Sequence, residues 1–242
     1  MRERQRQASQ FLIVVLILLP AIGCGKKMVG SPPPIDAYTG IVANDNDRLQ
    51  ESLFKGDQAV LSNQDIERIL GARLLLDDRR RLAVLRLNSR ITWSEELADL
   101  ETQNSERFLQ ALRSAKRLTQ VRLMPALLVP EKQTVPYLRE AAARFQADLL
   151  LVYATRVQTF RQGRFIGPDE VRARCIVDSV LLDVRTGIVV HSAQVAESVD
   201  AKKAQGELNF SETVAKAEAN ASGKALLKVA DGVVAYINEP AN

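Results

Sequence analysis

The fold is decided by residues 171–198, which read VRARCIVDSVLLDVRTGIVVHSAQVAES. Apolar and polar residues alternate from Val171 to Val184 and again from Ile188 to Val199, which is the period of a half-buried β-strand. Arg185-Thr186-Gly187 joins the two runs, and glycine can supply a positive φ in so short a connection. The stretch therefore predicts a β-hairpin of two long antiparallel strands.

Upstream of the hairpin, strand patterns alternate with helix patterns. Residues 149–153 are continuously apolar, which is typical of a strand covered on both faces, and period-two alternation then continues to Phe160. Pro125 marks an edge or a bend in an extended segment, and Thr134 directly precedes a helical stripe. The elements predicted before the hairpin are strands at 81–87, 121–129 and 149–160, and helices at 94–115 and from 135 onward.

A long helix is predicted after the hairpin. Asn209-Phe-Ser-Glu212 is a capping box. The apolar stripe behind it comprises Phe210, Val214, Ala217, Ala221, Leu226, Val229, Val233 and Ile237. Together the patterns predict an α+β fold, a mixed β-sheet with helices packed on it in the order β-α-β-α-β-β-β-α, after a signal peptide and a flexible tether.

The N-terminal segment has the three parts of a secretory signal peptide. MRERQR is basic, Phe11–Leu19 is apolar, and small residues follow. A transmembrane helix needs about 20 apolar residues, and Phe11–Gly23 supplies thirteen. A signal peptide over residues 1–23 is therefore predicted, and a short transmembrane anchor is the alternative interpretation.

Ala21-Ile22-Gly23-Cys24 resembles the lipobox of bacterial lipoproteins. The resemblance implies cleavage before Cys24, a diacylglycerol on its sulfur and an acyl chain such as palmitate on its amine. Two or more chains hold a protein stably at a bilayer, whereas one is marginal. Gly25 stands where an aspartate would retain the protein at the inner membrane, so the resemblance implies an outer-membrane location facing the periplasm.

Four segments are expected along the chain. Residues 1–23 are the lipoprotein signal peptide, and residues 24–47, rich in Gly, Pro, Asp and Asn, form a flexible tether. Residues 48–81 are a partly helical lead-in, in which Ser62 could cap a helix with Ile66, Ile69 and Leu70 on one face. Residues 82–238 form the globular domain.

The charge is mild. Removal of residues 1–23 lowers the net charge from +4 to +2, which does not support nucleic-acid binding. Arg79-Arg80-Arg81 is a local basic run just before a strand. We interpret it as a solvated edge, with a phosphate or anionic-lipid contact as the alternative.

No catalytic or metal-ligating set stands out. Cys175 lies in a strand pattern and is expected to be buried, and with Cys24 lipidated it has no disulfide partner. The single histidine, His191, is expected to be a surface or half-buried strand residue. A third hypothesis is a hydrolase that uses His191 with Asp178 or Asp183, but the sequence contains no G-x-S-x-G motif or other turn that would present a nucleophile. We expect no enzyme activity, no metal and no cofactor.

The hairpin also resembles a known family. Asp183-Val-Arg-Thr-Gly187 between two long strands, Leu82-Ala-Val-Leu85, and Phe145-Gln-Ala-Asp148 before a strand are similar to the curli-secretion-channel lipoproteins. Lipoproteins that activate penicillin-binding proteins, and the amino-terminal domain of the Tol-system β-propeller protein, share the broad layout. The resemblance covers about 120 residues and brings no catalytic residue, and no clear pair of the extra membrane-inserting hairpins of the curli channel is found here.

Aromatic residues beside loop signals mark a candidate partner surface. They are Trp93, Phe160 and Phe165, and Trp93 could equally pack the start of the following helix. We therefore expect a lipid-anchored envelope protein that acts as a non-catalytic binding or assembly module. Its partners would be the membrane, through Cys24, and an envelope protein or polymer, with a homo-oligomer as one arrangement. The alternative is a subunit of an oligomeric outer-membrane secretion pore.

Overall fold

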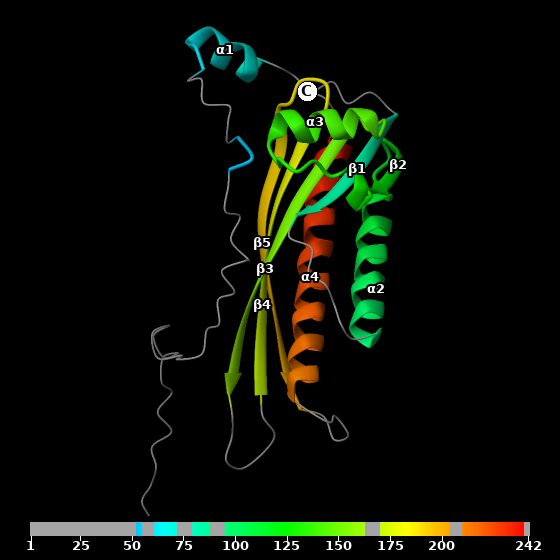
Figure 1. Cartoon of the computed structure of the whole chain (residues 1–242), viewed down its shortest axis with the longest axis vertical. Helices are drawn as coiled ribbons and strands as arrows, with labels where there is room; N and C mark the ends of the chain where they lie inside the picture. The colour runs from blue at the N-terminus through cyan, green and yellow to red at the C-terminus, as the bar shows by residue number, and fades with distance from the viewer. Residues whose placement is uncertain are drawn as a thin grey trace, which may run out of the picture. The chain divides into compact units, whose positions relative to one another are not determined.

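The computed structural model describes residues 52–54, 61–71, 79–87, 95–162, 170–203 and 210–239. Figure 1 labels the elements built from them. In chain order they are α1 (Asn63–Gly71), β1 (Arg80–Leu87), α2 (Glu95–Leu112), β2 (Leu118–Leu123), η3 (Ala126–Leu128), α3 (Val135–Arg144), β3 (Leu149–Gln162), β4 (Glu170–Asp183), β5 (Val189–Lys202) and α4 (Phe210–Asn238). The predicted fold class and the predicted order of strands and helices are confirmed.

The five strands form one mixed sheet in the order β2-β1-β3-β4-β5. β1 runs parallel to both β2 and β3, because α2 and α3 serve as the crossover connections that parallel strands require. β3, β4 and β5 are antiparallel neighbours. All three are 14 residues long. The predicted hairpin is therefore the β4–β5 pair, extended on its other side by β3.

One predicted segment ends earlier than its sequence suggested. Residues 121–129 were expected to be extended, but β2 ends at Leu123 and a 3-10 turn begins at Ala126. Met124 donates its backbone N–H to the Val84 carbonyl over 2.8 Å. The next residue, Pro125, has no N–H to donate, so the ladder stops there.

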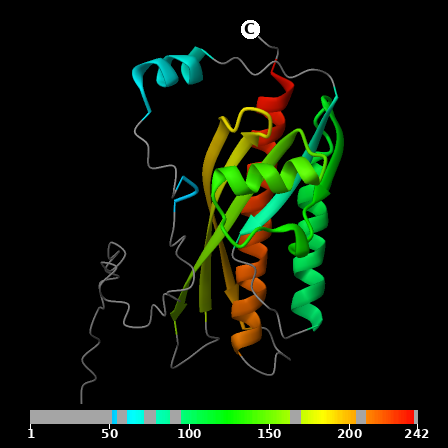
Figure 2. The same cartoon turned by 45° about the horizontal axis from the view of Figure 1, so that its top comes forward.

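Helices pack on both faces of the sheet. α2 and α4 cover one face, where Phe108 and Leu112 of α2 meet Leu82, Leu151 and their neighbours in a large apolar core. α3 covers the other face over a smaller core that includes Leu138 and Leu150. Figure 2 shows α3 lying across the strands while α4 runs along them. The predicted stripe of α4 is confirmed: seven of its members are buried, and Phe210 is partly buried against the same core.

A close approach of α2 and α4 depends on a glycine. Asn104 of α2 is only 8% exposed and donates its side-chain N–H to the Ala219 carbonyl of α4 over 2.9 Å. A Cβ atom on Gly223 would lie 2.5 Å from the side-chain oxygen of Asn104. The missing side chain at Gly223 thus makes room for the hydrogen bond that joins the two helices.

The β4–β5 turn explains the motif at the centre of the hairpin. Asp183 accepts hydrogen bonds at Oδ2 from the backbone N–H of Thr186, over 3.1 Å, and from its hydroxyl, over 2.7 Å. The same hydroxyl oxygen accepts the N–H of Ile188 over 3.2 Å. Gly187 has a φ of +77°, as predicted for a tight connection. Aspartate, threonine and glycine at this spacing therefore build the turn.

The lead-in helix is confirmed, with its cap. α1 begins after Ser62, whose hydroxyl accepts the backbone N–H of Asp65 over 3.1 Å. None of its residues is buried, and Leu70 is 80% exposed.

Several predictions lie outside the described residues. They concern the signal peptide over 1–23, the tether over 24–47, lipidation of Cys24, and the aromatic residues Trp93 and Phe165.

Candidate functional site

One face of the three long strands is only partly covered by a helix. α3 lies across the strands and packs over Leu150, Val152 and Leu182 near one end, whereas each strand of 14 residues spans up to about 47 Å. Figure 1 shows β3, β4 and β5 extending well past α3. We call this surface the open face; its residues are Arg156, Gln158, Phe160, Arg172, Arg174, Ile176, Asp178, Ser192, Gln194, Ala196, Ser198 and Asp200.

The structure places Phe160 on the open face, half-buried and opposite Arg172 of β4. A polar network crosses the three strands further along. Arg156 donates to Asp178 over 2.6 Å, and Gln194 donates to the other oxygen of the same carboxylate over 2.7 Å. Ion pairs as exposed as these add about 1 kcal/mol at most, so the network adds little to stability and mainly makes the open face polar.

β5 forms an edge of the sheet. Among the described strands it pairs only with β4, and it contains no proline over its 14 residues. A strand in this position presents unpaired N–H and C=O groups along its outer side, ready to pair with another strand. β2 forms the opposite edge and is only six residues long. The longer edge therefore belongs to β5.

Basic side chains gather at one end of the sheet, where β1, β2 and β3 begin and β4 ends. α2, α3 and α4 also end there. We call this region the arginine-rich end, and its basic residues are Arg79, Arg80, Arg81, Arg113, Lys116, Arg117, Arg144 and Arg185.

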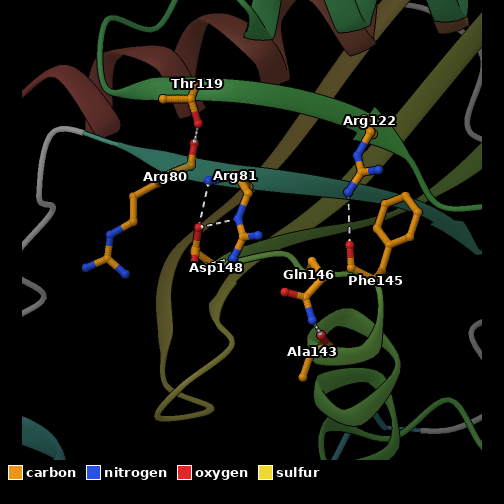
Figure 3. Close-up of polar contacts among 8 residues, drawn as sticks. All are labelled: Arg80, Arg81, Thr119, Arg122, Ala143, Phe145, Gln146 and Asp148. Carbon is orange, nitrogen blue, oxygen red and sulfur yellow. Dashed lines mark hydrogen bonds and ion pairs between the residues drawn. The ribbon is translucent and has the colours of Figure 1, made fainter.

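Asp148 holds the first strands together at this end. It accepts the backbone N–H of Arg81 over 3.0 Å and two guanidinium N–H groups of the same residue over 3.1 and 3.3 Å, as Figure 3 shows. Burial opposes ionisation of Asp148, but the hydrogen bonds from Arg81 outweigh it and lower the pKa of the carboxyl. The hydrogen bond to Asp148 in turn raises the pKa of Arg81.

Other contacts join the arginines at this end to backbone carbonyl groups. Arg80 donates its backbone N–H to the Arg117 carbonyl over 3.0 Å, and its own carbonyl accepts the hydroxyl of Thr119 over 3.2 Å. Arg117 reaches the last turn of α4 and donates to the Glu239 carbonyl over 2.7 Å. Cations are favoured at helix C-termini because the unpaired carbonyls carry partial negative charge.

Arg122 and Arg139 tie α3 and its following loop to the sheet. Arg122 of β2 lies 4.3 Å from the centre of the Phe145 ring and donates to the carbonyl of that residue over 3.0 Å (Figure 3). Arg139 of α3 donates to the carbonyls of Val184 and Arg185 in the β4–β5 turn, over 3.1 and 2.6 Å. The backbone at the arginine-rich end is thus fixed by several long-range contacts.

His191 lies between β5 and α4. It is half-buried, as expected, and stacks on Tyr236 with ring centres 5.3 Å apart. Its Nε2 is buried without a hydrogen-bond partner. Asp178 lies on the opposite face of the sheet, and Asp183 uses its Oδ2 in the turn. Within the described residues, neither carboxylate makes a hydrogen bond to His191.

Cys175 is fully buried in the core beneath α4, as predicted. In the described part of the chain, no three His, Cys, Asp or Glu side chains lie close enough together to hold a metal ion. None of the helices built from the same residues has the length and apolar character needed to cross a bilayer.

Comparisons with known proteins find solved structures of low similarity. No family model matches the sequence, and no curated protein matches it either. A hypothetical protein from Chlamydia trachomatis is 14% identical over 65% of this chain and 98% of its own, with a TM-score of 0.38. A minor lipoprotein from Acinetobacter baumannii is 14% identical over 66% of this chain and 92% of its own, with a TM-score of 0.31. A lipoprotein from Neisseria meningitidis is 12% identical over 60% of this chain and 99% of its own, with a TM-score of 0.31.

No family is shown by these similarities. Several of the similar structures are bacterial lipoproteins, but each of the three TM-scores lies below 0.5. The resemblance to the curli-secretion-channel lipoproteins therefore stays a prediction.

The sequence singled out Phe160 and Arg79-Arg80-Arg81 but missed their surroundings. It did not identify Asp148 as the partner of Arg81. A signal was present, because Arg81 and Asp148 each stand at the start of an apolar strand, and parallel strands begin at the same edge of a sheet. The long free edge of β5 was also open to prediction, since the last strand of a meander commonly lies at an edge.

Proposed function

We propose that this protein is a lipid-anchored envelope protein that acts as a non-catalytic binding or assembly module in the periplasm. The lipid sits on Cys24 at the outer membrane, and the domain engages an envelope protein. The single observation that carries the binding role is β5, a proline-free edge strand of 14 residues paired on one side only among the described strands.

Strand addition is the interaction that such an edge supports. An extended segment of a partner pairs with the free backbone groups of the edge, and side chains at alternate positions select the partner. Ser192, Gln194, Ala196 and Ser198 are exposed beside that edge and leave it sterically open because they are short or flexible. The partner would therefore lie beside β5 and rest on the adjoining open face, which includes Phe160.

The proposed tether would strengthen binding because it raises the effective concentration of the domain near a membrane-bound partner. A lipid at Cys24 and the tether predicted over residues 24–47 would confine the domain to a shell near the bilayer. Confinement of this kind gives an effective concentration of the order of mM for short linkers. Weak strand pairing is then sufficient for association with another membrane-bound protein.

Two measurements test the proposal. Mass spectrometry of the native protein is expected to show an N-terminus at Cys24 that bears diacylglycerol and an acyl chain; an uncut chain beginning at Met1 refutes the anchor. A photo-crosslinking amino acid at Ser198 on β5 is expected to capture a specific envelope protein in intact cells. The matched control is the same amino acid at the exposed Gln103 of α2. No capture at Ser198, or the same capture at both positions, refutes the binding role of β5.

The mass of the assembly in detergent separates this function from the pore alternative. A monomer or dimer agrees with a tethered module. A ring of many copies, with Ser198 crosslinking to a second copy of the chain, favours the secretion-pore subunit instead.

A further inference from the structure

We propose that the arginine-rich end is a docking surface for an anionic phospholipid membrane, so that the domain settles on the bilayer in one orientation. This inference rests on the proposed lipid anchor at Cys24. The sequence offered an anionic-lipid contact as the alternative interpretation of Arg79-Arg80-Arg81. In the folded protein these three residues are part of a larger basic surface.

The fold gathers cations from four separate segments at this end. Arg79, Arg80 and Arg81 lie at the start of β1, and the other segments are the α2–β2 connection, the last residue of α3 and the β4–β5 turn. A chain of hydrogen bonds shows that they are neighbours: Arg80 bonds to Arg117, Arg81 to Asp148, and the Asp148 carbonyl accepts the N–H of Val184 over 3.0 Å. The basic residues therefore share one surface although they are far apart in sequence.

Two acidic groups at this end, Asp148 and Asp183, are turned inward, whereas many basic ones point outward. The side chain of Asp148 is 14% exposed and is satisfied by Arg81, and Asp183 is 2% exposed within the turn. By contrast, Arg79, Lys116 and Arg185 are exposed. An incoming membrane would thus meet an excess of positive charge at the surface, while these two carboxylates lie behind it.

Four further acidic residues belong to the charge balance. Glu239 is exposed just past the end of α4 and offsets one of the exposed cations. Glu140 pairs with Arg144 across one turn of α3, so this pair adds no net charge. Asp77 and Asp78 precede Arg79 in the sequence and lie outside the described residues.

The lipid anchor selects a membrane as the partner. Among the described residues, the segment that bears Cys24 meets the domain first at Leu53, whose carbonyl accepts the backbone N–H of Val135 over 2.7 Å, and then enters the sheet through β1. β1 is the first described strand after Cys24, and it begins at the arginine-rich end. Basic residues near an anionic bilayer each strengthen binding about fivefold, and a cluster of them with a covalent lipid gives stable attachment.

The test uses the full lipidated protein with a fluorescent label at one of two positions. Gln120→Cys places the label at the arginine-rich end, beside Arg81 in the sheet, and Gln158→Cys places it far along β3 on the open face. Cys175 is buried and does not compete for the label. The protein is reconstituted in phosphatidylcholine vesicles that contain a nitroxide headgroup lipid as quencher, with or without phosphatidylglycerol.

Phosphatidylglycerol is expected to increase quenching at position 120 and to leave position 158 unchanged. Salt at about 1 M, where the Debye length is about 3 Å, should reverse the increase. The triple variant Arg79→Gln, Lys116→Gln, Arg185→Gln should weaken docking roughly 100-fold and abolish the increase. The matched control, Arg107→Gln, Arg174→Gln, Lys224→Gln, removes the same charge from exposed sites elsewhere and should retain it.

Each other outcome overturns the inference. Equal quenching with and without phosphatidylglycerol, equal quenching at both positions, or loss of the increase in both triple variants excludes a charge-specific docking end. The mass of the same purified protein reports the anchor independently. A lipidated protein without docking refutes this inference alone, whereas an unlipidated protein refutes the anchor and this inference together.

Discussion

The contact between α2 and α4 predicts that Gly223→Ala changes the free energy of unfolding in opposite directions, depending on whether Asn104 is present. Gly223→Ala adds a methyl group whose carbon would lie 2.5 Å from the Asn104 oxygen, so Asn104 must move and its 2.9 Å hydrogen bond to Ala219 is strained or lost. Overpacking of this kind costs about 1–3 kcal/mol. Alanine in place of glycine within a helix returns about 1 kcal/mol. The net expectation is a loss of up to about 2 kcal/mol in the free energy of unfolding.

The same substitution should be stabilising once Asn104 is shortened. In an Asn104→Ala background the obstructing amide is gone, so Gly223→Ala retains its gain in helix propensity of about 1 kcal/mol without the clash. Asn104→Ala alone should be destabilising by about 1–3 kcal/mol, because it leaves a cavity and removes a buried hydrogen bond. The double-mutant cycle therefore has a coupling energy of about 1–3 kcal/mol.

Urea denaturation of the four proteins in mild detergent, followed by near-ultraviolet circular dichroism, measures the cycle. Midpoints of thermal unfolding provide a second readout, at about 2–4 °C per kcal/mol for a chain of this size. An effect of Gly223→Ala that has the same sign and size in both backgrounds would refute the close helix–helix contact. Unchanged slopes with denaturant show that the unfolded states are comparable.

Three further predictions concern the β4–β5 turn, the contact between Asp148 and Arg81, and Cys175 in the core. Gly187→Ala should lower stability by about 1 kcal/mol or more in thermal melts, because φ is +77°, whereas Gly71→Ala, with open space around it, should not; equal effects would contradict the turn geometry. Asp148 has a lowered pKa, so its stabilising effect is present above its ordinary pKa of 3.8 and is lost as pH falls through the lower folded value. When the free energy of unfolding is measured as the pH is lowered, it should therefore fall less steeply in Asp148→Asn than in the unsubstituted protein. Parallel curves for the two proteins would show that Asp148 does not stabilise the fold through its ionised form. Cys175 is fully buried, so a thiol reagent should modify it only in denaturant; rapid modification of the native protein would contradict its place in the core.

The sequence predicted the parts of the fold that depend on residues close together in the chain. The stripe of α4 and the alternation of β4 and β5 follow from side chains that must face one apolar core, so both were readable from periodicity. The Gly187 turn was readable because a tight connection needs a residue that adopts positive φ. The end of β2 was missed, although Pro125 gave the signal, because apolar residues continue beyond it.

Contacts between distant segments could not be read in the same way. Asn104 resembles an ordinary polar residue of a helix until Gly223, more than a hundred residues later, is brought against it. The charge of the arginine-rich end likewise depends on which acids are buried: Asp148 and Asp183 cancel basic residues in a count along the sequence but lie inside the fold. The sequence thus predicts the elements and the mild net charge, whereas the cationic surface arises only from the packing.

The two proposed surfaces of the domain have a defined geometric relation. β5 begins at the arginine-rich end, where Val189 pairs with Leu182, and runs away from it for 14 residues to Lys202. At about 3.4 Å per residue the strand spans up to about 47 Å. Docking of the arginine-rich end on a bilayer would therefore direct the free edge of β5 away from the lipid surface and into the periplasm. A partner strand added there would be held along its length at increasing distance from the membrane, so the anchor and the edge can act together without competing for the same surface.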